Sequence, residues 1–280
     1  MKFSRFLGTV ALTAATCMFV ASCHKKTDDN TLTNVDDNGG YASDHAKMEQ
    51  NSNDVLSMAD IAASSNSGAG LRTSGTTIGA CATVTNDSMS TPHVLTIDFG
   101  ATNCTCADGK NRRGKIILTY TGRYKDEGST HTVTYSDYFV NDNQLSGSKT
   151  VTNMGMNTSG QYYYTVTVND TLNLGTGNGV IIWTGNRTRT WLSGYGTSER
   201  TDDSYLISGT TTLTRANGKT FAMNITTPLQ VAYGCEWIEK GVVAVTGPAG
   251  VTRTLDYGDG TCDSEATLTI GTRTYSITLR

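Results

Sequence analysis

Apolar and polar residues alternate along most of the chain, from about residue 78 to the C-terminus. A two-residue period is typical of β-strands with one face on a core and the other in water, because successive side chains point to opposite faces. Threonine, which favours strands, fills many of the polar positions. Strands are predicted at residues 96–99, 116–120, 130–135, 162–168, 180–183, 210–214, 242–245 and 267–270.

Short segments rich in Gly, Asn and Asp separate these strands and predict tight turns at residues 126–128, 141–143, 217–218 and 247–250. Asn217-Gly218 gives the clearest hairpin signal, and we expect a type I′ turn there, with positive φ at both central residues. The pattern predicts an all-β, antiparallel body of a dozen or more short strands. We expect an elongated sheet stack or a β-sandwich.

A different pattern occupies the region between residues 41 and 65. Asn53 can cap a helix, and the apolar residues after it recur at helical spacing. We expect one short helix near residues 53–63 that docks on the β body, because so short a helix is marginal alone. Its apolar face would consist of Val55, Leu56, Met58, Ala59 and Ile61.

The chain contains an internal repeat whose units end in an Asp-aromatic-Gly turn and a cysteine. The two copies are Ile97-Asp98-Phe99-Gly100 with Cys104, and Leu255-Asp256-Tyr257-Gly258 with Cys262. We expect each aspartate to accept a backbone N–H bond within its glycine turn. A weaker echo relates residues 146–152 to 208–214, so repeated blocks of strands or chance similarity between Thr-rich hairpins both remain open.

An upstream cysteine precedes each copy, at Cys81 and Cys235, and closes loops of similar length. We therefore predict two disulfides, Cys81–Cys104 and Cys235–Cys262, each stabilising the fold by about 3 kcal/mol. Cys106 is an alternative partner for Cys81.

The first residues have the features of an export signal. Lys2 and Arg5 precede an apolar run at residues 6–20, and the segment ends in Val20-Ala21-Ser22-Cys23. This ending resembles the lipobox of bacterial lipoproteins. The resemblance implies cleavage before Cys23 and attachment of lipid, with acyl chains such as palmitate, to its sulfur. The membrane would then be a partner through that lipid, at the periplasmic or cell-surface face of an outer membrane.

Residues 24–38 are polar and are expected to form a tether. Lys25-Lys26-Thr27-Asp28-Asp29 resembles the acidic export signal of certain Gram-negative surface lipoproteins, although a solvated linker explains it equally well. The whole chain resembles the Thr-rich β lipoproteins of Gram-negative bacteria, a resemblance that implies no activity. The expected organisation is a signal peptide at 1–22, a tether with the short helix at 23–77, and the β body at 78–280.

Composition excludes some classes of function. Without residues 1–22 the chain has 25 acidic residues against 22 − 2 = 20 basic ones, and this negative balance argues against nucleic acid as a partner. The sequence has no zinc, nucleophile-elbow or phosphate-loop motif, so we expect no metal and no cofactor. The four histidines are expected in solvated or turn positions. Asp256, Asp259 and Asp263 crowd one loop and could hold calcium through oxygen ligands, but they lack the spacing of an EF-hand.

Two clusters remain as candidates for binding. Tyr163, Trp191 and Tyr195 are the aromatic residues that would form a glycan-binding face, whereas Trp183 and Trp237 are expected in the core. A basic cluster is expected as a solvated hairpin tip or, alternatively, as an anion patch; it comprises Lys110, Arg112, Arg113 and Lys115. We expect a non-enzymatic module that binds a glycan or an envelope protein. The alternative is a polysaccharide-acting enzyme or an accessory glycan-binding protein.

Overall fold

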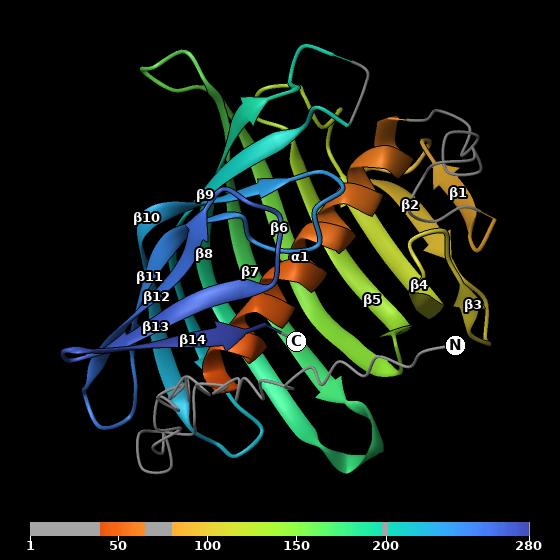
Figure 1. The fold of residues 1–280 in the computed structure, drawn as a ribbon. Helices are drawn as coiled ribbons and strands as arrows, with labels where there is room; N and C mark the ends of the chain where they lie inside the picture. The colour runs from red at the N-terminus through yellow and green to blue at the C-terminus, as the bar shows by residue number, and fades with distance from the viewer. Residues whose placement is uncertain (1–39, 65–79, 198–200, 280) are drawn as a thin grey trace, which may run out of the picture.

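The computed structural model describes residues 40–64, 80–197 and 201–279. Within these ranges one α-helix, α1 (Gly40–Ser64), lies against one antiparallel sheet of fourteen strands (Figure 1). The same ranges contain a single 3-10 turn, Gly175–Gly177. The strands are β1 (Thr83–Asp87), β2 (His93–Asp98), β3 (Cys104–Thr105), β4 (Asn111–Tyr120), β5 (Thr130–Val140), β6 (Asn143–Met156), β7 (Tyr162–Leu174), β8 (Gly179–Ser193), β9 (Ser204–Thr214), β10 (Thr220–Ala232), β11 (Lys240–Thr246), β12 (Thr252–Asp259), β13 (Glu265–Ile270) and β14 (Arg273–Thr278).

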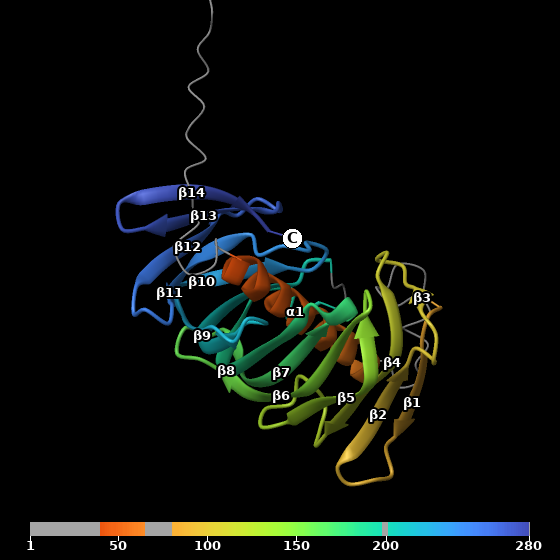
Figure 2. The same ribbon diagram turned by 90° about the horizontal axis from the view of Figure 1, so that it is seen from below.

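The sheet is a meander in which each strand pairs with the next along the chain, except that β3 pairs only with β4 and β2 therefore neighbours β4. The predicted all-β, antiparallel class is confirmed. The strands belong to a single sheet instead of two packed sheets, and Figure 2 shows how this sheet curls around α1. The helix thus takes the place that a second sheet has in a sandwich.

Bulges contribute to the curl of the sheet, because an extra residue bends the strand that carries it. The pairing of β4 with β5 shifts register between Arg113 and Lys115. The residue between them, Gly114, has a φ of 80°, and a Cβ there would collide with the carbonyl oxygen of Asp137. Glycine is therefore required where the strand bends.

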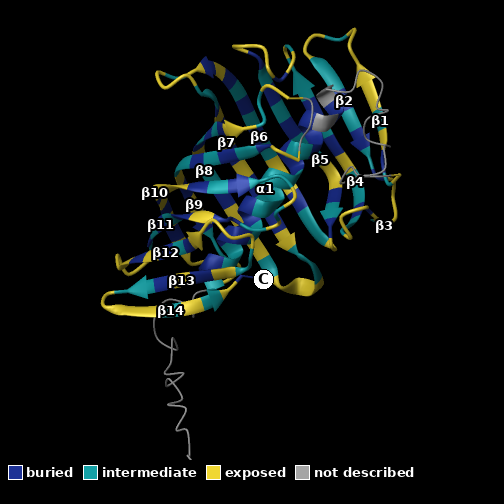
Figure 3. Cartoon of the chain, turned by 45° about the horizontal axis from the view of Figure 1, so that its top comes forward, coloured by how far each residue is buried: buried dark blue, intermediate teal, exposed yellow. Residues whose placement is uncertain are grey.

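The two faces of the sheet differ as the alternation predicts. On β7, Tyr164, Val166 and Val168 are buried on the inner face, while Thr165 and Thr167 are exposed on the outer face. Figure 3 shows the resulting alternation of buried and exposed positions along the strands. On the outer face one register row crosses six strands with Thr119, Thr132, Thr150, Thr167, Asn186 and Thr210.

The helix is longer and more deeply buried than the sequence indicates. It begins at Gly40, so the prediction of a short helix near residues 53–63 was wrong at its N-terminal end. Val55, Leu56, Met58 and Ala59 are buried as predicted. The first turns are also part of the core: the Tyr41 ring stacks on Phe221 of β10, with 4.8 Å between ring centroids.

Acidic residues along α1 pair with basic residues of the sheet. Glu49 contacts Arg187 of β8, and Asp54 lies 2.7 Å from Arg112 of β4. Both arginine side chains are almost fully buried. Residues of α1 that face the sheet therefore include charged ones. For this reason the apolar residues between 40 and 52 do not recur at a clear helical spacing.

The predicted turns are confirmed in position, with a correction of type. A hairpin does occur at Asn217-Gly218, but Gly218 has a positive φ, 79°, and Asn217 does not. The turn is therefore not type I′. Positive φ at two consecutive central residues, 49° and 62°, occurs instead at Asn141-Asp142, between β5 and β6.

Both predicted cysteine pairs form disulfides, Cys81–Cys104 and Cys235–Cys262. Cys106 is free and buried, and burial raises the pKa of its thiol. The repeated aspartates act as predicted. Asp98 accepts the N–H of Gly100 at 2.8 Å, and Asp256 accepts that of Gly258 at 3.0 Å.

Glu49→Gln is predicted to lower the free energy of unfolding by about 3–5 kcal/mol, because it leaves the buried Arg187 guanidinium without its carboxylate. Denaturant unfolding followed by circular dichroism measures the change. Glu265→Gln, at an exposed position, is the matched control and should change stability by no more than about 0.5 kcal/mol. A loss at Glu49 no larger than at Glu265 would contradict the assignment.

Candidate functional site

A pocket of about 450 Å³ lies between α1 and the loop that joins β10 to β11. This volume is in the range of small-molecule sites. The pocket is lined by Ala46, Gln50, Asn53, Asp54 and Ser57 of α1, by Ala107, Asp108 and Lys110 before β4, by Arg189, Tyr205 and Val231 of the sheet, and by residues 232–238 of the loop. We call it the helix–loop pocket.

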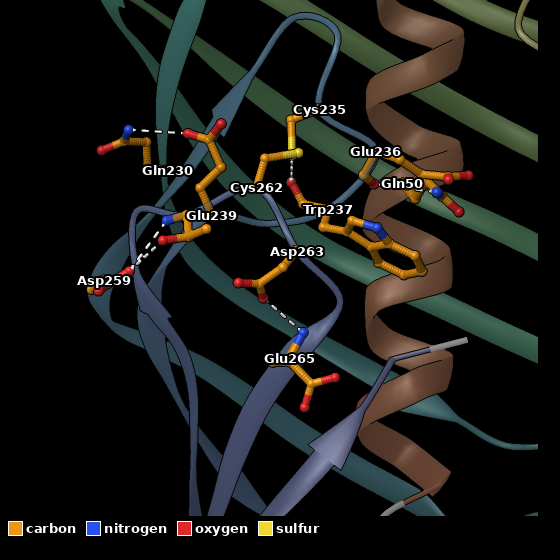
Figure 4. The surroundings of a disulfide bond; sticks show 11 residues. Gln50, Gln230, Cys235, Glu236, Trp237, Glu239, Asp259, Cys262, Asp263 and Glu265 are labelled. Atoms are coloured by element: carbon orange, nitrogen blue, oxygen red, sulfur yellow. Dashed lines mark hydrogen bonds between the residues drawn. A yellow bond between two sulfur atoms is a disulfide. The ribbon is translucent and has the colours of Figure 1, made fainter.

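The loop wall is fixed at two points. The Cys235–Cys262 disulfide ties the loop to the segment between β12 and β13, and the Gln50 side chain donates to the carbonyl of Glu236 at 3.2 Å. Figure 4 shows Trp237 between this disulfide and α1. Trp237 is half-buried at the pocket instead of in the deep core, so its predicted core position holds only in part.

One end of the pocket carries a closed ion-pair cluster. The Arg112 guanidinium donates to Asp108 at 2.6 and 2.8 Å and to Asp54 at 2.7 Å, and Lys110 lies 3.8 Å from Asp54. Burial disfavours the charge of Asp108, but Arg112 outweighs burial and lowers the pKa of this carboxyl. Both carboxylates are thus held by one guanidinium.

Arg189 and Tyr205 also line the pocket, and an aromatic cluster packs against Tyr205. The guanidinium carbon of Arg189 lies 3.4 Å from the centroid of the Tyr205 ring. Trp191 packs edge-on against Tyr205 at 4.6 Å and against Tyr195 at 5.2 Å. Burial raises the pKa of the Tyr205 hydroxyl, so the ring stays neutral.

The three residues predicted to bind glycan do not share one face. Trp191 is only 5% exposed, and Tyr195 stacks on Tyr162 with 3.6 Å between centroids. Tyr163 lies on the opposite face of β7 from its neighbours Tyr162 and Tyr164, because side chains alternate along the strand. The structure therefore brings Trp191 and Tyr195 together as support for the pocket wall and leaves Tyr163 outside.

A buried polar network lies under α1 near its N-terminus. His45 contacts the Tyr257 hydroxyl through Nδ1 at 2.8 Å and Arg187 through Nε2 at 3.2 Å. The same Nε2 lies 3.4 Å from the Glu49 carboxylate, so His45, Glu49 and Arg187 form one buried network. Burial lowers the pKa of His45, while Arg187 and His45 keep that of Glu49 low despite its burial. His45 and His131 are buried, so the expectation of solvated histidines was wrong for both.

The expected hairpin tip at residues 107–109 does form, exposed, between β3 and β4, but the basic cluster is not simply solvated. Its members lie just before and within the first part of β4, and each faces a carboxylate. Arg113 lies 2.5 Å from Asp142, Lys115 lies 2.9 Å from Asp98, and Arg112 and Lys110 face Asp54.

One group in the described part of the chain, Cys235, Glu239 and Cys262, has ligand atoms close enough together to hold a metal ion. Its two sulfurs are joined in the disulfide, so they are not free to act as thiolate ligands.

Sequence reasoning missed Arg189 and Tyr205 as pocket residues. A signal was present, since the alternation in residues 187–191 places Arg187, Arg189 and Trp191 on one face of β8. Charged residues at inward positions of a strand indicate either buried ion pairs or a site. Among the pocket residues of α1, Ala46 and Gln50 lie in the part of the helix that was not predicted, and those at 53–57 carried no comparable signal.

The fold and the pocket define an all-β protein whose single curled sheet encloses a helix and holds a ligand-sized pocket at the helix's side. Comparison with known protein families, characterised proteins and solved structures finds no match to this chain. No helix in the described ranges is long and apolar enough to cross a membrane.

Stability is predicted to fall as pH drops below about 6.5, because burial lowers the pKa of His45 and His131 in the folded state and the unfolded chain therefore binds protons more readily. In His45→Asn the slope of unfolding free energy against pH between 6.5 and 5 should decrease by up to about 1.4 kcal/mol per pH unit. Chemical denaturation at a series of pH values measures it.

The matched control is Tyr257→Phe, which removes the hydroxyl partner of His45 but keeps the imidazole. Its stability should fall while the pH slope stays close to that of the wild type. An unchanged slope in His45→Asn would contradict the assignment of a neutral, buried His45.

Proposed function

We propose that this protein is a lipid-anchored envelope protein that binds a saccharide in the helix–loop pocket without converting it. The observation that carries the proposal is the lining of this pocket. The half-buried Trp237 lines this pocket together with the amide-bearing residues Gln50 and Asn53. An aromatic surface with a few oriented polar groups suits a ligand that is apolar on its ring faces and rich in hydroxyls at its edges.

The carboxylates of the pocket favour binding over catalysis. A glycosidase needs one carboxyl with a raised pKa as its general acid and a second in a different environment. Asp54 and Asp108 share the same guanidinium, and the pKa of Asp108 is lowered. Glu236, the third carboxylate of the lining, is exposed to solvent. The two buried-side carboxylates thus form a static wall, and this favours binding over the alternative, a polysaccharide-acting enzyme.

The proposed anchor is Cys23 at the end of the lipobox-like segment, which lies outside the described residues. Sixteen residues separate Cys23 from Gly40, where the helix begins. Fully extended, such a segment reaches at most about 55 Å. The β body would therefore stay close to the membrane surface and present its pocket to envelope glycans there.

Trp237→Ala is predicted to weaken saccharide binding at least tenfold, because the ring provides the apolar wall of the pocket. Calorimetry against oligosaccharides from envelope and host polysaccharides measures binding, and circular dichroism confirms the fold. Tyr163→Ala, on the outer face of β7, is the matched control and should bind as the wild type does. Retained binding in Trp237→Ala would contradict the site, and release of shortened saccharides would favour the enzyme alternative.

Cys23→Ala is predicted to abolish incorporation of labelled palmitate and to move the protein from the membrane fraction to the soluble one. Expression in a Gram-negative host with radiolabelled palmitate tests this directly. Cys106→Ala provides the control, because this thiol is buried in the β body and should carry no lipid. Labelling that persists without Cys23 would contradict the proposed anchor.

A further inference from the structure

Arg189 is a buried charge of the helix–loop pocket to which the described residues give no counterion. Its side chain lines the pocket although the residue is only 6% exposed. Its Nε is buried without a hydrogen-bond partner, and no ion pair or hydrogen bond joins its guanidinium to any residue that the structure describes. The contact that holds it is the face of the Tyr205 ring.

The absence of a counterion at Arg189 is unusual compared with the neighbouring inward-facing arginines. Arg112 of β4 and Arg187 of β8 also point to the inner face, and each directly contacts a carboxylate. Burying a charge is costly unless it is paired and hydrogen-bonded. Buried polar groups without a partner are rare in folded proteins and call for an explanation.

The surrounding charges do not provide the missing partner. Asp60 and Asp203 act on Arg189 electrostatically, but neither forms an ion pair with it. Asp54 and Asp108, which also line the pocket, are bound to Arg112, and the exposed Glu236 forms no ion pair with Arg189. Arg189 therefore keeps its hydrogen-bonding capacity for an oxygen anion that enters from the pocket.

We propose that the saccharide bound in the helix–loop pocket is acidic and that its carboxylate pairs with Arg189. A guanidinium is planar and matches a carboxylate with two parallel N–H bonds. In this arrangement Trp237 packs against a sugar ring, and Arg189 binds the acidic group. This inference rests on the proposed binding function and narrows its ligand to uronic-acid-type sugars.

The test compares digalacturonate with its methyl ester, which has the same rings but no charge. The wild-type protein should bind the acid at least tenfold more tightly than the ester, with an affinity that falls as salt increases. Arg189→Gln should lose at least tenfold in affinity for the acid and stay within twofold for the ester. Arg189→Lys keeps the charge and should bind the acid better than Arg189→Gln does.

Two controls separate recognition from structure. Arg273→Gln, at an exposed position of β14, should bind both saccharides as the wild type does. Arg189→Gln should unfold within a few degrees of the wild type, because it removes no hydrogen bond or ion pair. A large loss of thermal stability would overturn the inference by making Arg189 a structural residue.

The outcomes also separate this inference from the function on which it rests. Equal binding of acid and ester would overturn the role of Arg189 and leave the saccharide site standing. Tighter binding of a sulfated disaccharide than of the uronic acid would show that Arg189 binds sulfate in preference to carboxylate. That result would overturn the proposed ligand class. Binding of none of these saccharides, in a protein that is folded, would overturn both proposals.

Discussion

The buried contact between Glu49 of α1 and Arg187 of β8 is the interaction on which the rest of the structure depends. A single meander sheet leaves its inner face in need of a covering layer, and α1 is the element that supplies it. Apolar contacts attract the helix to this face but do not define its position along it. The buried Glu49 carboxylate and Arg187 guanidinium define this position, because any shift of the helix would leave two buried charges unpaired.

The pocket is a consequence of that position. One wall is the side of α1, and the opposite wall is the β10–β11 loop, which the Cys235–Cys262 disulfide fixes to the far end of the sheet. The Arg112 cluster adds a second link between helix and sheet through Asp54. The walls are thus set by covalent and charged contacts, and the pocket is formed before a ligand arrives. A preformed site loses less conformational entropy on binding.

The sequence predicted what depends on local periodicity. Val166 and Thr167 alternate as a half-exposed strand requires, and the duplicated Asp-aromatic-Gly turn revealed both disulfides. It did not predict the first half of α1, because His45 and Glu49 lie at buried positions and make the segment appear polar. Their burial depends on Arg187, more than a hundred residues away. The pocket was not predicted for the same reason. Arg189 differs from its neighbours only in having no carboxylate paired with it, which is a property of the tertiary structure.

If α1 is an integral part of the core, its backbone amides must open only when the sheet does. Native-state hydrogen exchange measured by NMR compares amides of residues 45–58 with those in the centre of β7 and β8. The account predicts that both groups exchange with the same opening free energy, equal to that of global unfolding. Exchange of the helix amides at a much lower free energy, with the sheet still protected, would contradict it and make α1 a detachable segment on a sheet that is stable without it.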